Sequence, residues 1–242
     1  MADLYAPSSS NQLYAYCWTY DGVVVVVVPC NINLSPSSYE STNCHLHNDP
    51  PAPFSSISPD SGYTGNYWNL AMPVTLTTTQ VGQLETVYIT GDADYDAYYD
   101  YAVGYRGLVY IDNSTIFYQT GAIAPYYHGG NICNHWMTVN AATGLQSAAT
   151  FYINNYNPGQ KLCINDMALP IGGVFDLNDN WQPPHASHGQ GTAVDVAVTS
   201  AQCPHNYLVN LNRFRLACIN EGNSLALNTI AEGNHVHCRW AY

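Results

Sequence analysis

The chain has 242 residues, which is enough for one large domain or two modest ones. Only 5 Lys and Arg residues stand against 17 Asp and Glu, so the formal net charge of -12 excludes the cationic footprint of a nucleic-acid-binding protein and disfavours anionic membrane surfaces. No apolar run approaches the ~18 residues of a membrane-spanning helix, so we expect no membrane span.

Eight cysteines are scattered along the chain, and none of them form a Cys-x-x-Cys pair. An even number of widely spaced cysteines is typical of disulfide-bonded proteins in oxidising compartments. The sequence leaves their pairing open. We therefore expect a secreted protein, either extracellular or periplasmic, with disulfide bonds.

Residues 1–118 are expected to form an all-β module. Six consecutive valines, Val23–Val28, favour a strand that is covered on both faces. If the run were exposed, it would instead offer a surface for strand pairing between chains. Further strands are expected at Val74–Thr79 and Glu85–Thr90. Several short strands separated by turn residues predict an immunoglobulin-like β-sandwich.

Residues 119–242 combine segments with helical spacing and short segments typical of strands, which predicts an α+β domain. Apolar residues at helical spacing predict helices over Val139–Asn155 and Leu208–Asn220. Short strands are expected at Val194–Val198 and Val236–Trp240. These two strands would carry the polar residues of a candidate site.

A candidate zinc site is built from His188 and Asp195, seven residues apart, and from His235 and His237 further along the chain. Imidazole nitrogen and carboxylate oxygen are ligands that suit zinc, and three protein ligands leave a fourth position open for water. Residues two apart on a strand point to the same face, so one histidine of the pair can bind metal while the other reaches that water.

Three sequence blocks carry a resemblance to a known family: Asn165–Gly173, His185–Asp195 and Asn234–His237. The pattern His-x6-Asp followed by His-x-His resembles the zinc metallopeptidase superfamily of lysostaphin-type endopeptidases, D-alanyl-D-alanine carboxypeptidases and the hedgehog signalling domain. The blocks are most similar to the penicillin-insensitive murein endopeptidase branch. They cover about 75 residues of the C-terminal half.

The resemblance implies a fold and a set of metal ligands. It implies an antiparallel sheet with helices for residues 119–242, in the manner of hedgehog domains and D-Ala-D-Ala peptidases. It makes His188, Asp195 and His237 the ligands of a Zn²⁺ ion. It assigns His235 the role of general base or transition-state stabiliser, and Glu232 is a second candidate for the base.

Other residues are expected around this site. Arg239 follows His237 by two residues, so it is expected on the same strand face, where it could bind a substrate carboxylate or pair with a local acid. His185 and Asp166 both belong to the resembling blocks. They are expected to contact the metal ligands and fix their orientation without binding the metal themselves. A second His-x-His, at His45 and His47, falls in the β-rich half and is interpreted as structural or at the surface.

The leading hypothesis for function is an extracellular zinc-dependent peptidase that hydrolyses amide bonds in peptidoglycan stems or similar peptides. Gly189, Ala193 and Ile171 stand where relatives of the resembling family often have polar side chains, which favours a non-catalytic zinc-binding protein as an alternative. The valine run and 21 tyrosines favour a third hypothesis, a self-assembling extracellular structural protein that forms homo-oligomers through the β module.

Overall fold

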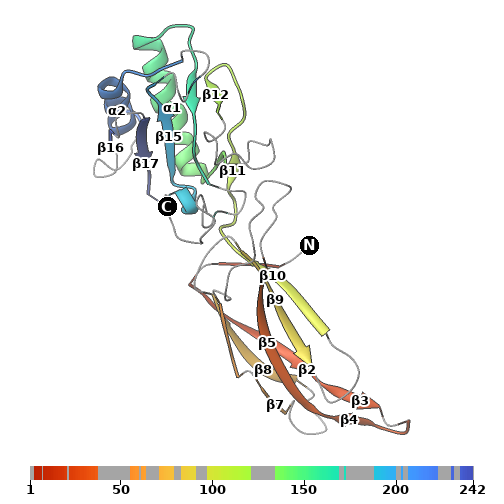
Figure 1. Cartoon of the computed structure of the whole chain (residues 1–242). Coiled ribbons are helices and arrows are strands. Elements are labelled where there is room, and N and C mark those ends of the chain that lie inside the picture. Colours follow the sequence, from red (N-terminus) through yellow and green to blue (C-terminus); the bar gives the residue numbers. More distant parts are fainter. Residues whose placement is uncertain are drawn as a thin grey trace. The chain divides into compact units, whose positions relative to one another are not determined.

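The computed structural model of the chain describes residues 3–6, 8–20, 22–37, 55–59, 61–63, 71–78, 83–90, 97–120, 134–168, 172, 188–199, 203, 207–222, 230–231 and 235–241. They divide into two compact units, one ending at Tyr105 and the other extending from Arg106 (Figure 1). Most of the described elements are strands, and two are helices. The α+β class expected for the chain is confirmed at this coarse level.

Two of the sheets described in the first unit share one apolar core. The larger sheet has the strand order β1 (Asp3–Tyr5), β10 (Ala97–Val103), β9 (Gln83–Thr90), β5 (Pro29–Ser37) and β7 (Ser61–Tyr63). The smaller sheet has the order β2 (Ser10–Tyr16), β8 (Ala71–Thr77) and β6 (Ser56–Ser58). Alternate apolar residues of β2, β5 and β8 form the core, and a disulfide joins Cys17 to Cys30 within it.

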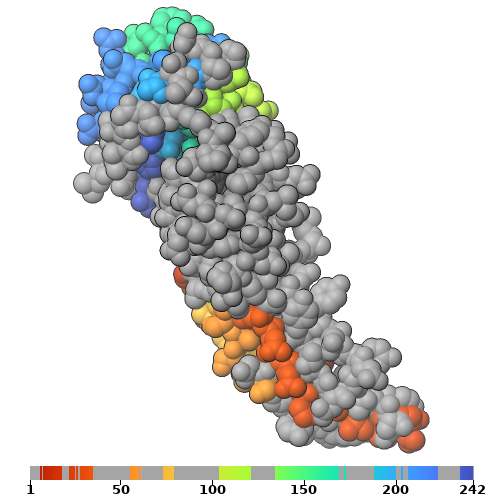
Figure 2. Space-filling view, in the orientation of Figure 1, coloured from red at the N-terminus to blue at the C-terminus, as the bar shows by residue number. Residues whose placement is uncertain are grey.

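The valine run forms a hairpin at one end of the first unit, where β3 (Trp18–Tyr20) pairs with β4 (Val25–Val27) in a two-stranded sheet (Figure 1). Val23, Val24 and Val26 are 82%, 42% and 40% exposed, so the expectation of a strand covered on both faces is wrong. The orange-red atoms of this segment reach the surface in Figure 2. Branched side chains favour a strand, but neighbouring elements decide whether it is covered.

The second unit contains a five-stranded sheet with the order β12 (Phe117–Gln119), β14 (Leu162–Ile164), β15 (Ala193–Ala197), β17 (His235–Arg239) and β16 (Ile230–Ala231). The pairing is antiparallel from β14 to β16, as the resemblance implied. The pair β12–β14 is parallel, which the prediction missed. Parallel neighbours require a crossover connection, and the helix that follows Thr138 lies between these two strands in the sequence. A separate short ladder joins β11 (Val109–Tyr110) to β13 (Trp136–Met137).

Two capped helices pack on this sheet. Helix α1 (Val139–Tyr156) begins after Thr138, whose side chain accepts a hydrogen bond from the backbone N–H of Ala141. Helix α2 (Leu211–Asn220) begins after Asn210, which accepts from Arg213 in the same way. The predicted helices agree with α1 to one residue and with α2 except for its first turn.

The helices cover one face of the sheet, and this positions the other face for a site. Apolar residues of β15 and β17 share a core with α1 and α2: Val194, Val196, Val236 and Cys238. Because side chains alternate along a strand, the intervening residues of β15 and β17 point to the opposite face. Asp195, His235 and His237 are among these intervening residues.

Three disulfides lie within the described residues: Cys17–Cys30, Cys163–Cys203 and Cys218–Cys238. The last bond ties α2 to β17. The remaining two cysteines, Cys44 and Cys133, lie outside the described residues. Disulfides indicate a compartment other than the reducing cytoplasm. Neither described helix combines the length and hydrophobicity needed to cross a bilayer.

At Gly144, helix α1 lies close to Trp240 and Gly222. A Cβ atom there would collide with the indole of Trp240 and lie 2.5 Å from the carbonyl oxygen of Gly222. Gly144→Ala is therefore expected to destabilise the second unit by ~1–3 kcal/mol through overpacking, although alanine favours helices by ~1 kcal/mol over glycine at open positions. Urea denaturation measures the change. Ser147→Ala, at an exposed position of the same helix, should leave the free energy of unfolding nearly unchanged.

Candidate metal centre

Strands β15 and β17 bring two of the predicted ligands face to face. In their antiparallel register Asp195 lies opposite His237, and Ala197 lies opposite His235. Directly opposite side chains on one sheet face have Cβ atoms ~4.5–5.5 Å apart. Asp195 and the two histidines therefore share the sheet face that the helices leave uncovered.

The third predicted ligand, His188, is held by a short turn just before β15. It opens the 3₁₀ helix η1 (His188–Gln190), which ends at Gly191 with a φ of +69°. The N–H of Gly191 donates to the carbonyl of His188 at 2.9 Å, and its own carbonyl accepts from the N–H of Thr138 at 2.8 Å. A Cβ at position 191 would lie 2.7 Å from the side chain of Leu108. Glycine is therefore required to fasten the His188 turn to the start of α1.

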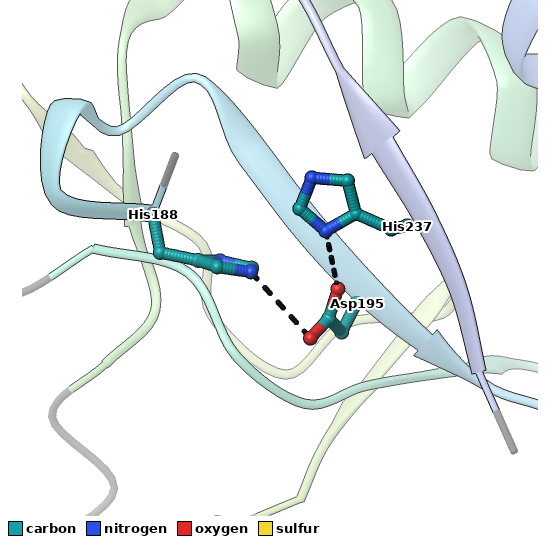
Figure 3. Close-up of side chains that lie close together, drawn as sticks. All are labelled: His188, Asp195 and His237. Atoms are coloured by element: carbon teal, nitrogen blue, oxygen red, sulfur yellow. Dashed lines mark hydrogen bonds and ion pairs between the residues drawn. The ribbon is translucent and has the colours of Figure 1, made fainter. Parts of the chain in front are cut away.

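The structure brings His188, Asp195 and His237 together, as predicted (Figure 3). One ligand atom from each residue lies within 4.8 Å of the others. The Nδ1 atom of His237 is 2.8 Å from Oδ1 of Asp195, and Nε2 of His188 is 3.5 Å from Oδ2. The two imidazole rings are nearly perpendicular, with centroids 5.0 Å apart. The three side chains converge on one small volume.

Burial and charge at this position favour an ionised carboxylate. His188 and Asp195 are 1% and 2% exposed. Burial by itself would raise the pKa of Asp195, but the imidazole of His188, supported by His237 and His235, outweighs it and holds that pKa well below its usual range. A buried carboxylate surrounded by histidines is a pre-formed anionic site for a cation.

The donor set fits a divalent transition metal. Two imidazoles and one carboxylate are the ligand types of catalytic zinc sites, in which a fourth position stays open. The same donors also suit other first-row metals, so the geometry supports a metal ion without identifying the element. His188, Asp195 and His237 are the residues that would hold it.

His235 lies beside this group on the same face of β17. Its Nε2 atom is 3.5 Å from Oδ2 of Asp195, and the residue is 9% exposed. Arg239, at the other end of β17, donates from Nη2 to Oε1 of Gln190 at 3.4 Å. Both residues therefore lie next to the three-residue group, at opposite ends of the strand that carries His237.

Asp166 supports the site through its backbone and carries a second carboxylate. Its carbonyl accepts from the N–H of Asp195 at 3.0 Å, and the N–H of Asn165 donates to the carbonyl of Asp195 at 2.8 Å. The side chain of Asn134 donates to Oδ1 of Asp166 at 2.6 Å. Burial and the charge of Asp195 raise the pKa of Asp166 to about 6, against the opposing effects of His188, His235 and Asn134.

Two residues near Asp166 were not predicted from the sequence. Asn134 is the hydrogen-bond partner of Asp166, and His135 is fully buried beside it with Nε2 3.1 Å from the carbonyl of Ile164. No spacing or motif marked either residue. Two predicted site residues, His185 and Glu232, lie outside the described residues.

The fold and the site together define a mixed α+β protein with a buried His-His-Asp group that can hold a metal ion. No protein-family model matches the chain, and no curated protein matches it significantly in sequence.

Proposed function

We propose that the protein is a secreted, zinc-dependent peptidase that hydrolyses amide bonds in peptidoglycan stems or similar peptides. The observation that carries the proposal is the convergence of His188, Asp195 and His237 within 4.8 Å on the sheet face opposite the helices. The resemblance of the surrounding sequence to zinc metallopeptidases points to the same chemistry. The three disulfides support an extracellular or periplasmic location.

When bound, a zinc ion supplies Lewis-acid chemistry, by polarising a carbonyl oxygen and lowering the pKa of water towards ~7. His235 is our candidate for the general base, and the supporting observation is that its Nε2 atom lies 3.5 Å from the carboxylate of Asp195. It would accept a proton at Nε2 and return it to the leaving amine. Glu232 is the second candidate for this role.

The proposal extends to the finer description of both units. We infer that the first unit is an immunoglobulin-like β-sandwich, because its five-stranded and three-stranded sheets share one core. We infer that the second unit has the fold of hedgehog domains and D-Ala-D-Ala peptidases, because its helices cover one sheet face and its metal ligands occupy the other. The generic role for the first unit is to bind substrate or tether the enzyme.

Metal analysis combined with a peptidoglycan digestion assay tests the proposal. We expect about one zinc per chain and release of stem peptides by the purified protein. His237→Ala should lose both zinc and activity, because two protein ligands remain in place of three. His47→Ala, in the other His-x-His pair, is the matched control and should retain both. A correctly folded wild-type protein that takes up no zinc would falsify the metal assignment.

A non-catalytic zinc-binding protein is the first alternative. The specific observation in its favour is the neutral, buried side chain of Ala193, which lies on β15 two residues before Asp195. A zinc-loaded protein that releases no stem peptide from any peptidoglycan preparation would support this alternative over the peptidase.

A self-assembling structural protein is the second alternative, and the exposed valines of the β3–β4 hairpin favour it. Exposed, uncharged β-hairpins are templates for pairing between chains. Native mass spectrometry distinguishes this alternative. Multimers that disappear in a Val24→Lys variant would support it, whereas a monomer at high protein concentration would argue against it.

A further inference from the structure

The three-stranded sheet of the first unit exposes one face to solvent. Leu13, Val74 and Ile57 turn the other face of β2, β8 and β6 towards the apolar core of the unit. Because side chains alternate along a strand, the intervening residues point outward. Those of β2 and β8 that are exposed are Ser10, Gln12, Tyr14, Tyr16, Pro73 and Thr75. Together with the two exposed serines of β6, they form a surface that we call the tyrosine face.

Two aromatic rings dominate the tyrosine face. Tyr14 and Tyr16 are 56% and 59% exposed. Residues two apart on a strand point the same way and stand ~7 Å apart, so the two rings form a row along β2. Tyr14 lies opposite Pro73 on β8, which adds a third ring beside the row. Single exposed apolar residues are common on protein surfaces, but adjacent ones are typical of a binding surface.

The tyrosine face carries no charge. None of the residues of β2, β6 or β8 is ionised, within a chain whose formal net charge is -12. A cationic ligand would find no carboxylate on these strands, and an anionic ligand would find no Lys or Arg. Aromatic rings also stack on nucleic-acid bases, but proteins that bind single strands combine the rings with a positively charged groove. The tyrosine face therefore matches an uncharged partner.

The size of the face argues against a folded protein as that partner. Seven residues make β2 and β8 each about 24 Å long, and three strands are about 14 Å across. The face thus covers at most ~340 Å², whereas each partner in a stable protein interface contributes ~800 Å². The core of such an interface is also more apolar than this surface, in which hydroxyls and an amide surround the rings. A narrow, extended ligand fits these dimensions better.

The chemistry of the face matches a sugar chain. Pyranose rings expose C–H groups on their faces, which pack against the electron-rich face of a tyrosine ring, and hydroxyls at their edges. Serine and threonine hydroxyls donate and accept hydrogen bonds, as sugar hydroxyls do, and the Gln12 amide adds two donors and an acceptor. A β-1,4-linked glucan is uncharged and extended, so it can lie along β2. The methyl groups of an N-acetylated chain would find only the Pro73 ring as aliphatic surface among the exposed residues of these strands.

We propose that the tyrosine face binds an uncharged β-1,4-linked glucan. The rings of Tyr14 and Tyr16 stack on neighbouring sugar rings of one chain, and the side chains of Gln12 and Thr75 form hydrogen bonds with sugar hydroxyls. Tyrosine suits this role because it supplies a large, rigid contact area with only two side-chain torsions to immobilise. The inference gives the first unit a ligand of its own. It holds whether or not the second unit is a peptidase.

The experiment measures binding of the full-length chain to microcrystalline cellulose, by depletion of protein from solution, and to soluble cellohexaose by calorimetry. We expect saturable binding to cellulose that cellohexaose competes away. Salt should have little effect, because no charged group of these strands takes part. Tyr14→Thr and Tyr16→Thr should each weaken binding about 10- to 100-fold, the range found when an aromatic side chain that stacks on a ligand ring is truncated.

Further variants separate ring stacking from other effects. Threonine keeps a hydroxyl and a strong preference for strands, so the threonine variants should unfold in urea like the wild type. Tyr14→Phe and Tyr16→Phe keep the rings and should retain most of the affinity. Leu216→Ala is the matched control for adsorption through exposed apolar surface, because Leu216 is 57% exposed on α2 of the second unit. It should bind cellulose as the wild type does.

Several outcomes would overturn the inference. A wild type that binds neither cellulose nor cellohexaose would do so, as would binding that survives in the Tyr14→Thr, Tyr16→Thr double variant. Tighter binding to chitin than to cellulose would assign the face to an N-acetylated chain. Dimers that disappear in the double variant, without any glucan binding, would assign it to a second copy of the chain. Loss of glucan binding after a chelator removes metal would place the ligand at the metal centre, whereas unchanged binding by a protein that cuts no peptide would contradict only the peptidase proposal.

Discussion

Asp195→Asn is expected to weaken zinc binding by at least 100-fold. Loss of a residue that merely orients a metal ligand typically costs 10- to 100-fold in affinity, and Asp195 is itself placed as a ligand. The amide keeps one acceptor oxygen but puts an NH₂ group where the second carboxylate oxygen now faces His188 and His235 at 3.5 Å. It also removes the negative charge that would offset the metal. Competition with a chromophoric zinc chelator measures the loss.

Asp112→Asn is a suitable control for the same chemical change. Asp112 is exposed, and its carboxylate accepts a local hydrogen bond from the N–H of Asn113. We expect its zinc affinity to equal that of the wild type. An Asp195→Asn protein that binds zinc as tightly as the wild type would show that Asp195 is not a ligand, and that the carboxylate only orients His237.

Acid should destabilise the second unit through His135. Burial lowers the pKa of His135 to about 4 from 6.5, although the hydrogen bond to the carbonyl of Ile164 opposes the shift. The unfolded chain, with a pKa near 6.5, therefore binds a proton more readily than the folded chain. Stability from this group is full above pH 6.5 and is lost as pH falls towards 4, up to ~3 kcal/mol.

Urea denaturation of the metal-free protein at several pH values measures this effect, because metal release then does not contribute. His135→Gln is the comparison, since a glutamine amide can still donate to the carbonyl of Ile164 but does not titrate. The wild type should lose ~3 kcal/mol more than the variant between pH 7 and 4. Parallel curves for the two proteins would mean that His135 is solvated or differently paired.

Local sequence patterns predicted the elements that are defined by residues close together in the sequence. The apolar spacing of 139–155 identified α1, because the same residues that define the pattern, such as Leu145 and Tyr152, form its buried face. The start of α2 was placed three residues too early because Leu208 and Val209 are apolar but precede the cap at Asn210. Caps depend on one side-chain hydrogen bond, which a hydrophobic pattern does not reveal.

Features that depend on distant partners were not predictable in this way. The exposure of Val23 depends on what lies beside the hairpin, and the parallel pairing of β12 with β14 depends on the path of the chain through α1. The convergence of His188, Asp195 and His237 could be predicted because the resemblance to zinc metallopeptidases assigns these three residues to one site. His135 could not, because its contact with the carbonyl of Ile164 joins positions 29 residues apart with no shared motif.

The alternation along β17 has a consequence for protein engineering. His235, His237 and Arg239 face the site, whereas Val236 and Cys238 face the helices, where Cys238 is bonded to Cys218. Inserting or deleting one residue next to this strand would turn every side chain to the wrong face. The disulfide opposes such a slip from the far side of the sheet. Grafting of segments before β17 should therefore preserve the phase of this strand.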